Sequence, residues 1–142
     1  MKRILFACVG NAMRSQMAEG LGRALAQAGT IEIRSGGTAP AGFVHPKAIR
    51  SMQRRGIDIS RHASKALDLD FARQADAIVT LCGPLDDACP AVLFPKVVDW
   101  TMPDPSWGDE AEVDQIRDAI ETRIVTLYRD WGILREGAAV RF

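Results

Sequence analysis

The segment around Cys8 has the residue types of an oxyanion-binding loop that carries a nucleophile. Cys8 lies near the end of a short apolar run and stands six residues before Arg14, in the stretch CVGNAMRS, where a predicted strand leads into a predicted helix. Such a turn presents several backbone N–H groups at the positive end of a helix dipole, and the arginine adds a planar fork of donors. We expect the loop to hold a dianion of phosphate size and to favour the thiolate form of Cys8.

The predicted substrate-binding residues form one continuous stretch. Gly10 and Asn11 are residue types that tolerate the unusual backbone angles of such a loop, and Ser15 can donate its hydroxyl to the cysteine sulfur. The residues assigned to substrate binding are Val9, Gly10, Asn11, Ala12, Met13, Arg14 and Ser15. The alternative interpretation is a small buried cysteine at a strand end, followed by a solvated arginine.

Asp104 is the predicted proton donor. It lies just after the last predicted strand and precedes Pro105, which restricts the local backbone and so fixes the direction of the carboxyl group. Displacement of an oxygen from an oxyanion by Cys8 requires a proton for the departing oxygen. The alternative is a simple turn, because Pro-Asp-Pro is favourable turn chemistry.

Cys82 and Cys89 form a second feature, with six residues between them. A zinc site would need a Cys-x-x-Cys pair and two more ligands, and the chain offers only His45 and His62, at spacings that do not match. No metal is therefore expected. The glycine and proline between the two cysteines suggest a segment that lets their sulfurs meet. In a reducing compartment, three cysteines leave catalysis, redox chemistry or plain burial as options.

The elements that must position these groups alternate between strand and helix. Strands are predicted over 3–9, 31–35, 75–81 and 97–100, and helices over 14–28, 46–55 and 109–131, with polar connection over 57–70. This order predicts an α/β fold with a single doubly wound four-stranded parallel sheet and helices on both faces. Ligands bind beyond the carboxyl ends of such strands. These ends lead to Cys8, Ser35, Cys82 and Asp104.

Length and composition fit one globular domain. With 142 residues, we assign 1–134 to a single catalytic domain and 135–142 to a C-terminal tail that we expect to be mobile. Lys plus Arg and Asp plus Glu both number 18, so the chain lacks the basic excess of a nucleic-acid-binding protein. The apolar run at 4–9 is too short for a signal peptide, and no stretch reaches the length of a membrane span. We expect a cytoplasmic monomer that does not contact membranes.

Two segments together resemble a known family. The stretch ILFACVGNAMRSQMAEG resembles the active-site signature of low-molecular-weight tyrosine phosphatases and of the thioredoxin-coupled arsenate reductases that share their fold. Three details favour the reductases. Gln16 stands where the phosphatases usually have proline, and Ser106-Trp107 stand where they tend to have tyrosines. The stretch IVTLCGPLDDACP resembles the reductase segment that carries both later redox cysteines.

The resemblance implies a three-cysteine relay that reduces arsenate to arsenite. Arsenate binds the loop 9–14, Cys8 attacks arsenic and Asp104 protonates the departing oxygen. Cys82 then attacks Cys8, which releases arsenite, and Cys89 attacks Cys82. The Cys82–Cys89 disulfide passes to reduced thioredoxin, which is the implied partner and reductant. No tightly bound cofactor is expected, and phosphate or sulfate would compete with arsenate.

A cation site beside the loop departs from the family pattern. Lys65 stands where some reductases have an aspartate that helps to hold potassium, whereas Asn11, Glu19 and Ser35 match the other members of that site. The ammonium of Lys65 can replace the cation, so we predict little potassium dependence; the alternative is a surface lysine. Met13 stands where many relatives carry another cysteine, which we take to be dispensable.

Two other functions stay open. A phosphatase for phosphotyrosine or small phosphoesters would use Cys8, Arg14 and Asp104 and ignore the two later cysteines, and weak phosphatase activity can coexist with arsenate reduction. A non-catalytic redox or oxyanion sensor on the same fold would need a partner surface. A dinucleotide-binding domain is excluded because the first turn lacks Gly-x-Gly-x-x-Gly.

Overall fold

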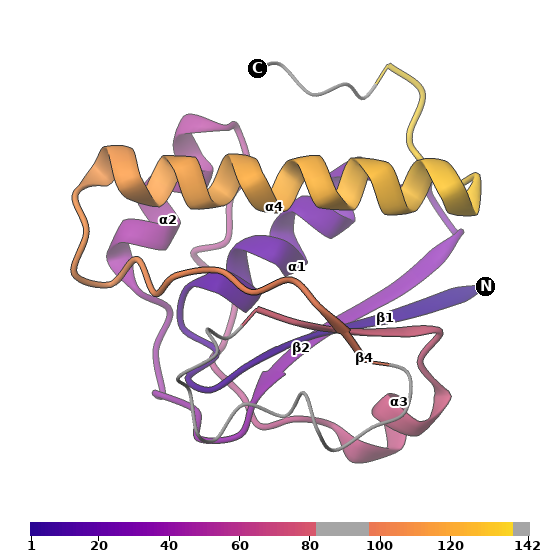
Figure 1. Ribbon diagram of the computed structural model, residues 1–142, viewed down its shortest axis with the longest axis horizontal. Helices are drawn as coiled ribbons and strands as arrows, with labels where there is room; N and C mark the ends of the chain where they lie inside the picture. The colour runs from indigo at the N-terminus through magenta and orange to yellow at the C-terminus, as the bar shows by residue number, and fades with distance from the viewer. Residues whose placement is uncertain (82–96, 138–142) are drawn as a thin grey trace.

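The computed structural model describes residues 1–81 and 97–137, and Figure 1 shows strands and helices that alternate along the chain. The elements are β1 (Lys2–Cys8), α1 (Arg14–Leu25), β2 (Ile31–Gly37), α2 (Pro46–Arg54), α3 (Leu69–Gln74), β3 (Ala77–Thr80), β4 (Val97–Asp99) and α4 (Glu110–Trp131). Cys82 and Cys89 lie outside the described residues.

The strands form one parallel sheet in the order β2-β1-β3-β4. The register pairs Cys8 with Gly37 and Ala7 with Thr80, and Thr80 in turn with Asp99, so the carboxyl ends of all four strands meet at one edge. Residues 4–7 of β1 are fully buried, as expected for a central parallel strand covered on both faces. The predicted fold class is confirmed.

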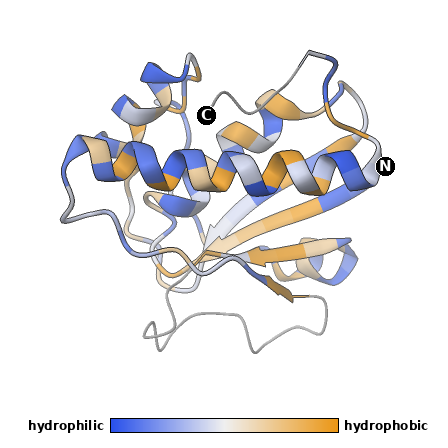
Figure 2. Cartoon of the chain, turned by 45° about the horizontal axis from the view of Figure 1, so that its top comes forward, coloured by the Kyte–Doolittle hydropathy of each residue, from blue (hydrophilic) through white to orange (hydrophobic). Residues whose placement is uncertain are grey.

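Helices cover both faces of the sheet, with α1, α2 and α4 on one side and α3 on the other (Figure 1). Successive side chains of a strand point to opposite faces, so Ile4 and Phe6 of β1 enter the larger core with α1 and α4, while Leu5 packs with Phe71 of α3. Figure 2 shows hydrophobic and hydrophilic residues alternating along α4, which is the pattern of an amphipathic helix.

Close packing of α1 against α4 depends on Gly22. A Cβ atom at this position would lie 2.9 Å from the Tyr128 hydroxyl oxygen and 3.2 Å from the Phe6 ring. The Tyr128 hydroxyl instead donates to the Gly22 carbonyl at 3.0 Å, and burial raises the pKa of this tyrosine. The contact holds α1, and therefore the loop that precedes it, in a fixed position over the sheet.

Helix α3 corrects the sequence prediction, which placed a polar connection over 57–70. Asp68 caps this helix by accepting a hydrogen bond from the Phe71 N–H at 3.0 Å. The helix spans six residues, less than two turns, so it is too short to show helical periodicity in the sequence.

Helix α1 ends at Leu25, before the predicted end at Ala28. The chain leaves the helix because the Gln27 N–H donates to the Ile133 carbonyl at 2.8 Å, which joins it to the segment after α4. That segment stays attached as far as Arg135, whose N–H donates to the Leu25 carbonyl at 2.7 Å. Residues 138–142 of the predicted tail lie outside the described residues. Within the described ranges, we find no helix with the length and apolar character to cross a membrane.

Candidate active site

Cys8 lies at the centre of a curled loop between β1 and α1. Its Sγ is 2.9 Å from the Ser15 Oγ and accepts a hydrogen bond from the Asn11 N–H at 3.2 Å. The cysteine is buried, with 2% of its surface exposed. The sulfur is therefore held in place by the residues of the loop itself.

Asn11 fixes the shape of the loop. Its φ of 48° is in the left-handed region, which asparagine adopts more readily than most residues. Its side-chain amide donates to the Ser15 Oγ at 2.7 Å and to the Ser35 Oγ at 3.1 Å. The amide oxygen accepts from the Lys65 N–H and the Gln16 Nε2, each at 2.9 Å. Four hydrogen bonds of the Asn11 side chain therefore hold this backbone conformation.

The segment that follows β2 holds the outer side of the loop, and the sequence did not reveal this role. The N–H groups of Thr38, Ala39 and Ala41 donate to the carbonyls of residues 8, 9 and 10, at 3.3, 2.9 and 2.9 Å. Because a trans peptide directs its N–H away from its carbonyl, these bonds turn the N–H groups of residues 10 and 11 to the inner side. A Cβ at Gly37 would lie 2.3 Å from the Val9 carbonyl oxygen, so the close approach requires glycine.

Arg14 joins the loop to the other strand ends. Its Nη1 donates to the carbonyl of Leu81, after β3, at 3.1 Å and to that of Met102, after β4, at 2.9 Å. The residue is 7% exposed, so the alternative of a solvated arginine is wrong. A buried cation anchored in this way is pre-organised for an anion at the loop.

Asp104 lies in the chain after β4, and Ser106 holds its carboxylate. The Ser106 N–H and hydroxyl donate to the Asp104 Oδ1 at 2.9 and 2.6 Å. Partial desolvation raises the pKa of Asp104, but the bonds from Ser106 and the charge of Arg14 outweigh it and hold that pKa below its ordinary value. Nearby Met13 is buried, with its Sδ 3.4 Å from the Ser106 Oγ.

The four residues predicted for a cation site come together, and Lys65 itself supplies the positive charge. The Lys65 Nζ lies 3.1 Å from the Glu19 Oε1 and 3.0 Å from the Ser35 Oγ, while its backbone N–H binds Asn11. Burial raises the pKa of Glu19, but the hydrogen bond from Ser35 and the charge of Lys65 outweigh it, so that pKa is lowered. The ammonium sits among the oxygens that would coordinate potassium, so the residues present do not fit an added cation.

Gln16 and His62 extend this network, a role for His62 that its place in the sequence did not indicate. The Gln16 Nε2 donates to the Asn11 and Ala63 carbonyls at 3.0 and 2.9 Å, and its Oε1 lies 3.0 Å from the His62 Nδ1. Burial lowers the pKa of His62, so the ring is neutral near pH 7. Across 1–81 and 97–137, no three His, Cys, Asp or Glu side chains are grouped to hold a metal.

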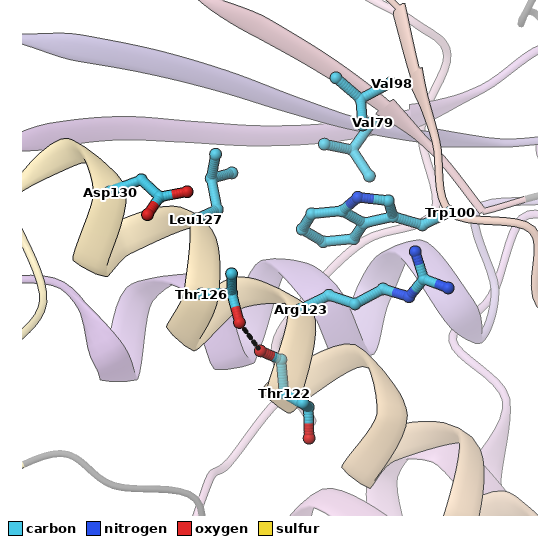
Figure 3. Close-up of a pocket in the computed structure, with 8 residues that line it drawn as sticks. All are labelled: Val79, Val98, Trp100, Thr122, Arg123, Thr126, Leu127 and Asp130. Atoms are coloured by element: carbon cyan, nitrogen blue, oxygen red, sulfur yellow. Dashed lines mark hydrogen bonds between the residues drawn. The ribbon is translucent and has the colours of Figure 1, made fainter.

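A separate hollow of about 290 Å³ lies between α4 and the β3–β4 side of the sheet (Figure 3). Its lining residues are Val79, Val98, Trp100, Thr122, Arg123, Thr126, Leu127 and Asp130. None of them belongs to the loop around Cys8 or to the Asp104 turn, so this hollow is distinct from the candidate active site.

The parallel sheet carries a loop with a cysteine and an arginine after β1 and a carboxylate after its edge strand β4. This arrangement defines an enzyme that acts on oxyanions with a thiol nucleophile. The sequence comparison makes the class specific: the chain belongs to the low molecular weight phosphotyrosine protein phosphatase family, whose model matches residues 3–136.

Relatives within this family include arsenate reductases. An arsenate reductase of Staphylococcus haemolyticus is 42% identical over 125 residues, which cover 87% of this chain and 93% of the relative. The solved structure of an arsenate reductase in its phosphate-binding state has a TM-score of 0.77 at 32% identity and covers 92% of this chain and 98% of that one. The solved structure of a thioredoxin-dependent arsenate reductase of Corynebacterium glutamicum has a TM-score of 0.73 at 33% identity. The match covers 92% of this chain and 61% of that one.

Proposed function

We propose that this chain reduces arsenate to arsenite with Cys8 as nucleophile and thioredoxin as the final reductant. The observation that carries the proposal is the setting of the Cys8 sulfur, which lies 2.9 Å from the Ser15 Oγ and 3.2 Å from the Asn11 nitrogen inside a loop that begins a helix. The likeness to arsenate reductases over most of the chain supports the choice of arsenate.

The first half of the proposed reaction joins sulfur to arsenic. Arsenate binds to the N–H groups of the loop 9–14 and to Arg14. The Cys8 thiolate forms a sulfur–arsenic bond, and the arsenic–oxygen bond on the opposite side breaks. Asp104 gives its proton to the departing oxygen, which leaves as water.

The second half reduces arsenic by two electrons. The Cys82 thiolate attacks the Cys8 sulfur and forms a Cys8–Cys82 disulfide. The electron pair of the sulfur–arsenic bond passes to arsenic, which leaves as arsenite. Cys89 then attacks Cys82 and frees the Cys8 thiolate. Reduced thioredoxin supplies the two electrons that open the Cys82–Cys89 disulfide. Support for these two cysteines is their spacing and the likeness to thioredoxin-dependent relatives. A relay that starts from free thiols requires a reducing compartment, in keeping with a cytoplasmic enzyme.

A phosphatase is the second candidate, and the family match favours it. The same loop, with Cys8, Arg14 and Asp104, would accept a phosphoester and pass through a phosphocysteine that water hydrolyses. This activity needs neither Cys82 nor Cys89.

A coupled assay separates the two candidates. Arsenate-dependent NADPH oxidation is followed with purified thioredoxin and thioredoxin reductase, beside hydrolysis of para-nitrophenyl phosphate. Sustained, thioredoxin-dependent NADPH oxidation supports the reductase. Hydrolysis of the phosphoester with no arsenate-dependent oxidation would establish a phosphatase.

Potassium is expected to have no effect on the wild-type enzyme, because the Lys65 ammonium already neutralises Glu19. At constant ionic strength, kcat and Tm should be the same in potassium and in a bulky organic cation. Lys65→Asp supplies the matched variant: it leaves the carboxylate of Glu19 beside a second carboxylate, so potassium should raise its Tm and its activity. Strong potassium activation of the wild type would contradict the assignment.

Asp104→Asn is expected to lower kcat/KM for arsenate by about 10²-fold, because the amide cannot supply a proton. The ratio of wild-type to variant kcat/KM should be largest at acidic pH and fall as pH rises, since the protonated fraction of Asp104 falls. Its lowered pKa places the start of this decline below the ordinary carboxyl range. A ratio independent of pH would exclude Asp104 as the proton donor.

A further inference from the structure

The first turn of α2 contacts both halves of the candidate active site. The helix begins at Pro46, directly after His45, whose N–H donates to the Ala12 carbonyl of the Cys8 loop at 2.9 Å. Two residues later, the Lys47 Nζ donates to the Gly108 carbonyl at 2.7 Å and to the Ser106 carbonyl at 3.2 Å. The two contacts attach the nucleophile loop and the Asp104 turn to a single rigid element.

Lys47 occupies a position that helix electrostatics disfavours. A cation in the first turn lies at the positive end of the helix dipole, where acidic side chains are preferred. The His45 side chain caps this end by accepting from the Lys47 N–H at 3.1 Å, which leaves the lysine side chain to extend away from the helix. The half-buried ammonium is compensated by two backbone carbonyls of another segment. The dipole of α2 does not favour a lysine here, whereas the two carbonyls of the turn bind its ammonium.

The segment that Lys47 holds is the one that aims the carboxylate. The Gly108 N–H donates to the Pro105 carbonyl at 3.0 Å and closes a turn, at whose tip Trp107 is 96% exposed. Inside the turn, the Ser106 N–H and hydroxyl both bind the Asp104 Oδ1. Lys47 therefore binds the carbonyls of Ser106 and Gly108, on either side of Trp107, and limits the movement of the turn whose Ser106 N–H and hydroxyl orient the carboxylate of Asp104.

We propose that Lys47 is a positioning residue that fixes the proton donor relative to Cys8. It acts through the turn 105–108, and α2 carries the coupling to the Cys8 loop through the His45–Ala12 hydrogen bond. The inference rests on the role of Asp104 in the proposed function. Misplacement of a catalytic group by about 1 Å lowers rates strongly, which gives such a tether a kinetic effect beyond stability.

Four variants test the proposal: Lys47→Met, Lys47→Arg, Arg50→Met as a matched control, and Lys47→Met combined with Asp104→Asn. Arg50 lies one turn along α2 and pairs with Glu110 at 2.8 Å, so it joins α2 to α4 without contacting the turn. Arsenate kinetics are measured with thioredoxin regeneration, and amide hydrogen exchange is measured at Ser106 and Gly108.

Lys47→Met is expected to lower kcat about tenfold with little change in KM, and to speed exchange at both amides. Lys47→Arg should restore most of kcat, because a guanidinium also donates to two carbonyls. Arg50→Met should change neither quantity. In the Asp104→Asn background, Lys47→Met should cause less than about a twofold further loss, since the group it positions is absent.

Independent losses in the double variant would overturn the proposal, as would unchanged exchange at Ser106 and Gly108 in Lys47→Met. Failure of the proposed function has a different signature: wild type would not turn over arsenate, or Asp104→Asn would match wild type. In that event the exchange rates of the two amides still decide whether Lys47 holds the turn.

Discussion

Cys8→Ser is expected to abolish arsenate turnover while the loop continues to bind oxyanions. The reaction needs a sulfur that bonds to arsenic and then forms a disulfide, and a serine oxygen cannot form the disulfide. We expect kcat to fall by more than about 10⁴-fold. The loop N–H groups and Arg14 are unchanged, so calorimetric titration should show phosphate or arsenate binding within a few-fold of wild type.

The replacement is a strict control for structure, because serine keeps the size and the hydrogen-bonding capacity of the side chain. The Ser15 hydroxyl and the Asn11 N–H, which contact the sulfur, can both bind a serine oxygen. The Tm should therefore be close to that of wild type. A Cys8→Ser protein that folds, binds arsenate and still reduces it repeatedly would exclude Cys8 as the nucleophile.

Cys82→Ser is expected to stop the reaction once arsenate has bonded to Cys8, one event per chain, before arsenic is reduced. Arsenate can still form its bond to Cys8, but no second thiolate is available to take the Cys8 sulfur and leave the electron pair on arsenic. Multiple turnover with thioredoxin should be lost, and a rapid-mixing experiment should show at most one equivalent of bound arsenic.

Phosphoester hydrolysis supplies the control for Cys82→Ser. Water, not a thiol, would complete that reaction, so the rate with para-nitrophenyl phosphate should match wild type if the wild type has this activity. If Cys82→Ser and wild type reduce arsenate at the same multiple-turnover rate, Cys82 has no part in the relay.

The strands and the nucleophile loop could be predicted from sequence because their signals are local. The run that ends at Cys8 is continuously apolar, as a strand buried on both faces must be, and the loop after it combines glycine, asparagine and arginine within a few residues. The short helix α3 was not predicted, because its six residues follow a capping aspartate but are too few to show a helical repeat of apolar residues.

The parts of the site that the sequence did not reveal come from distant segments. The bonds from the N–H groups of residues 38, 39 and 41 to the Cys8 loop, and those from Lys47 to the Asp104 turn, are long-range bonds to backbone carbonyls. Carbonyls are the same in every residue, so no residue type marks them. The position of Lys65, in contrast, could be predicted, because a lysine at a cation site is marked by its residue type. Its ammonium lies within hydrogen-bonding distance of Glu19 and Ser35.

Disulfide mapping after a single exposure to arsenate, with thioredoxin omitted, tests the relay most directly. Alkylation of free thiols followed by peptide mass spectrometry should find a Cys82–Cys89 disulfide and an alkylated Cys8 in wild type. In Cys89→Ser it should find a Cys8–Cys82 disulfide, and in Cys82→Ser neither disulfide. Release of one equivalent of arsenite from wild type with all three thiols still free would contradict the three-cysteine relay.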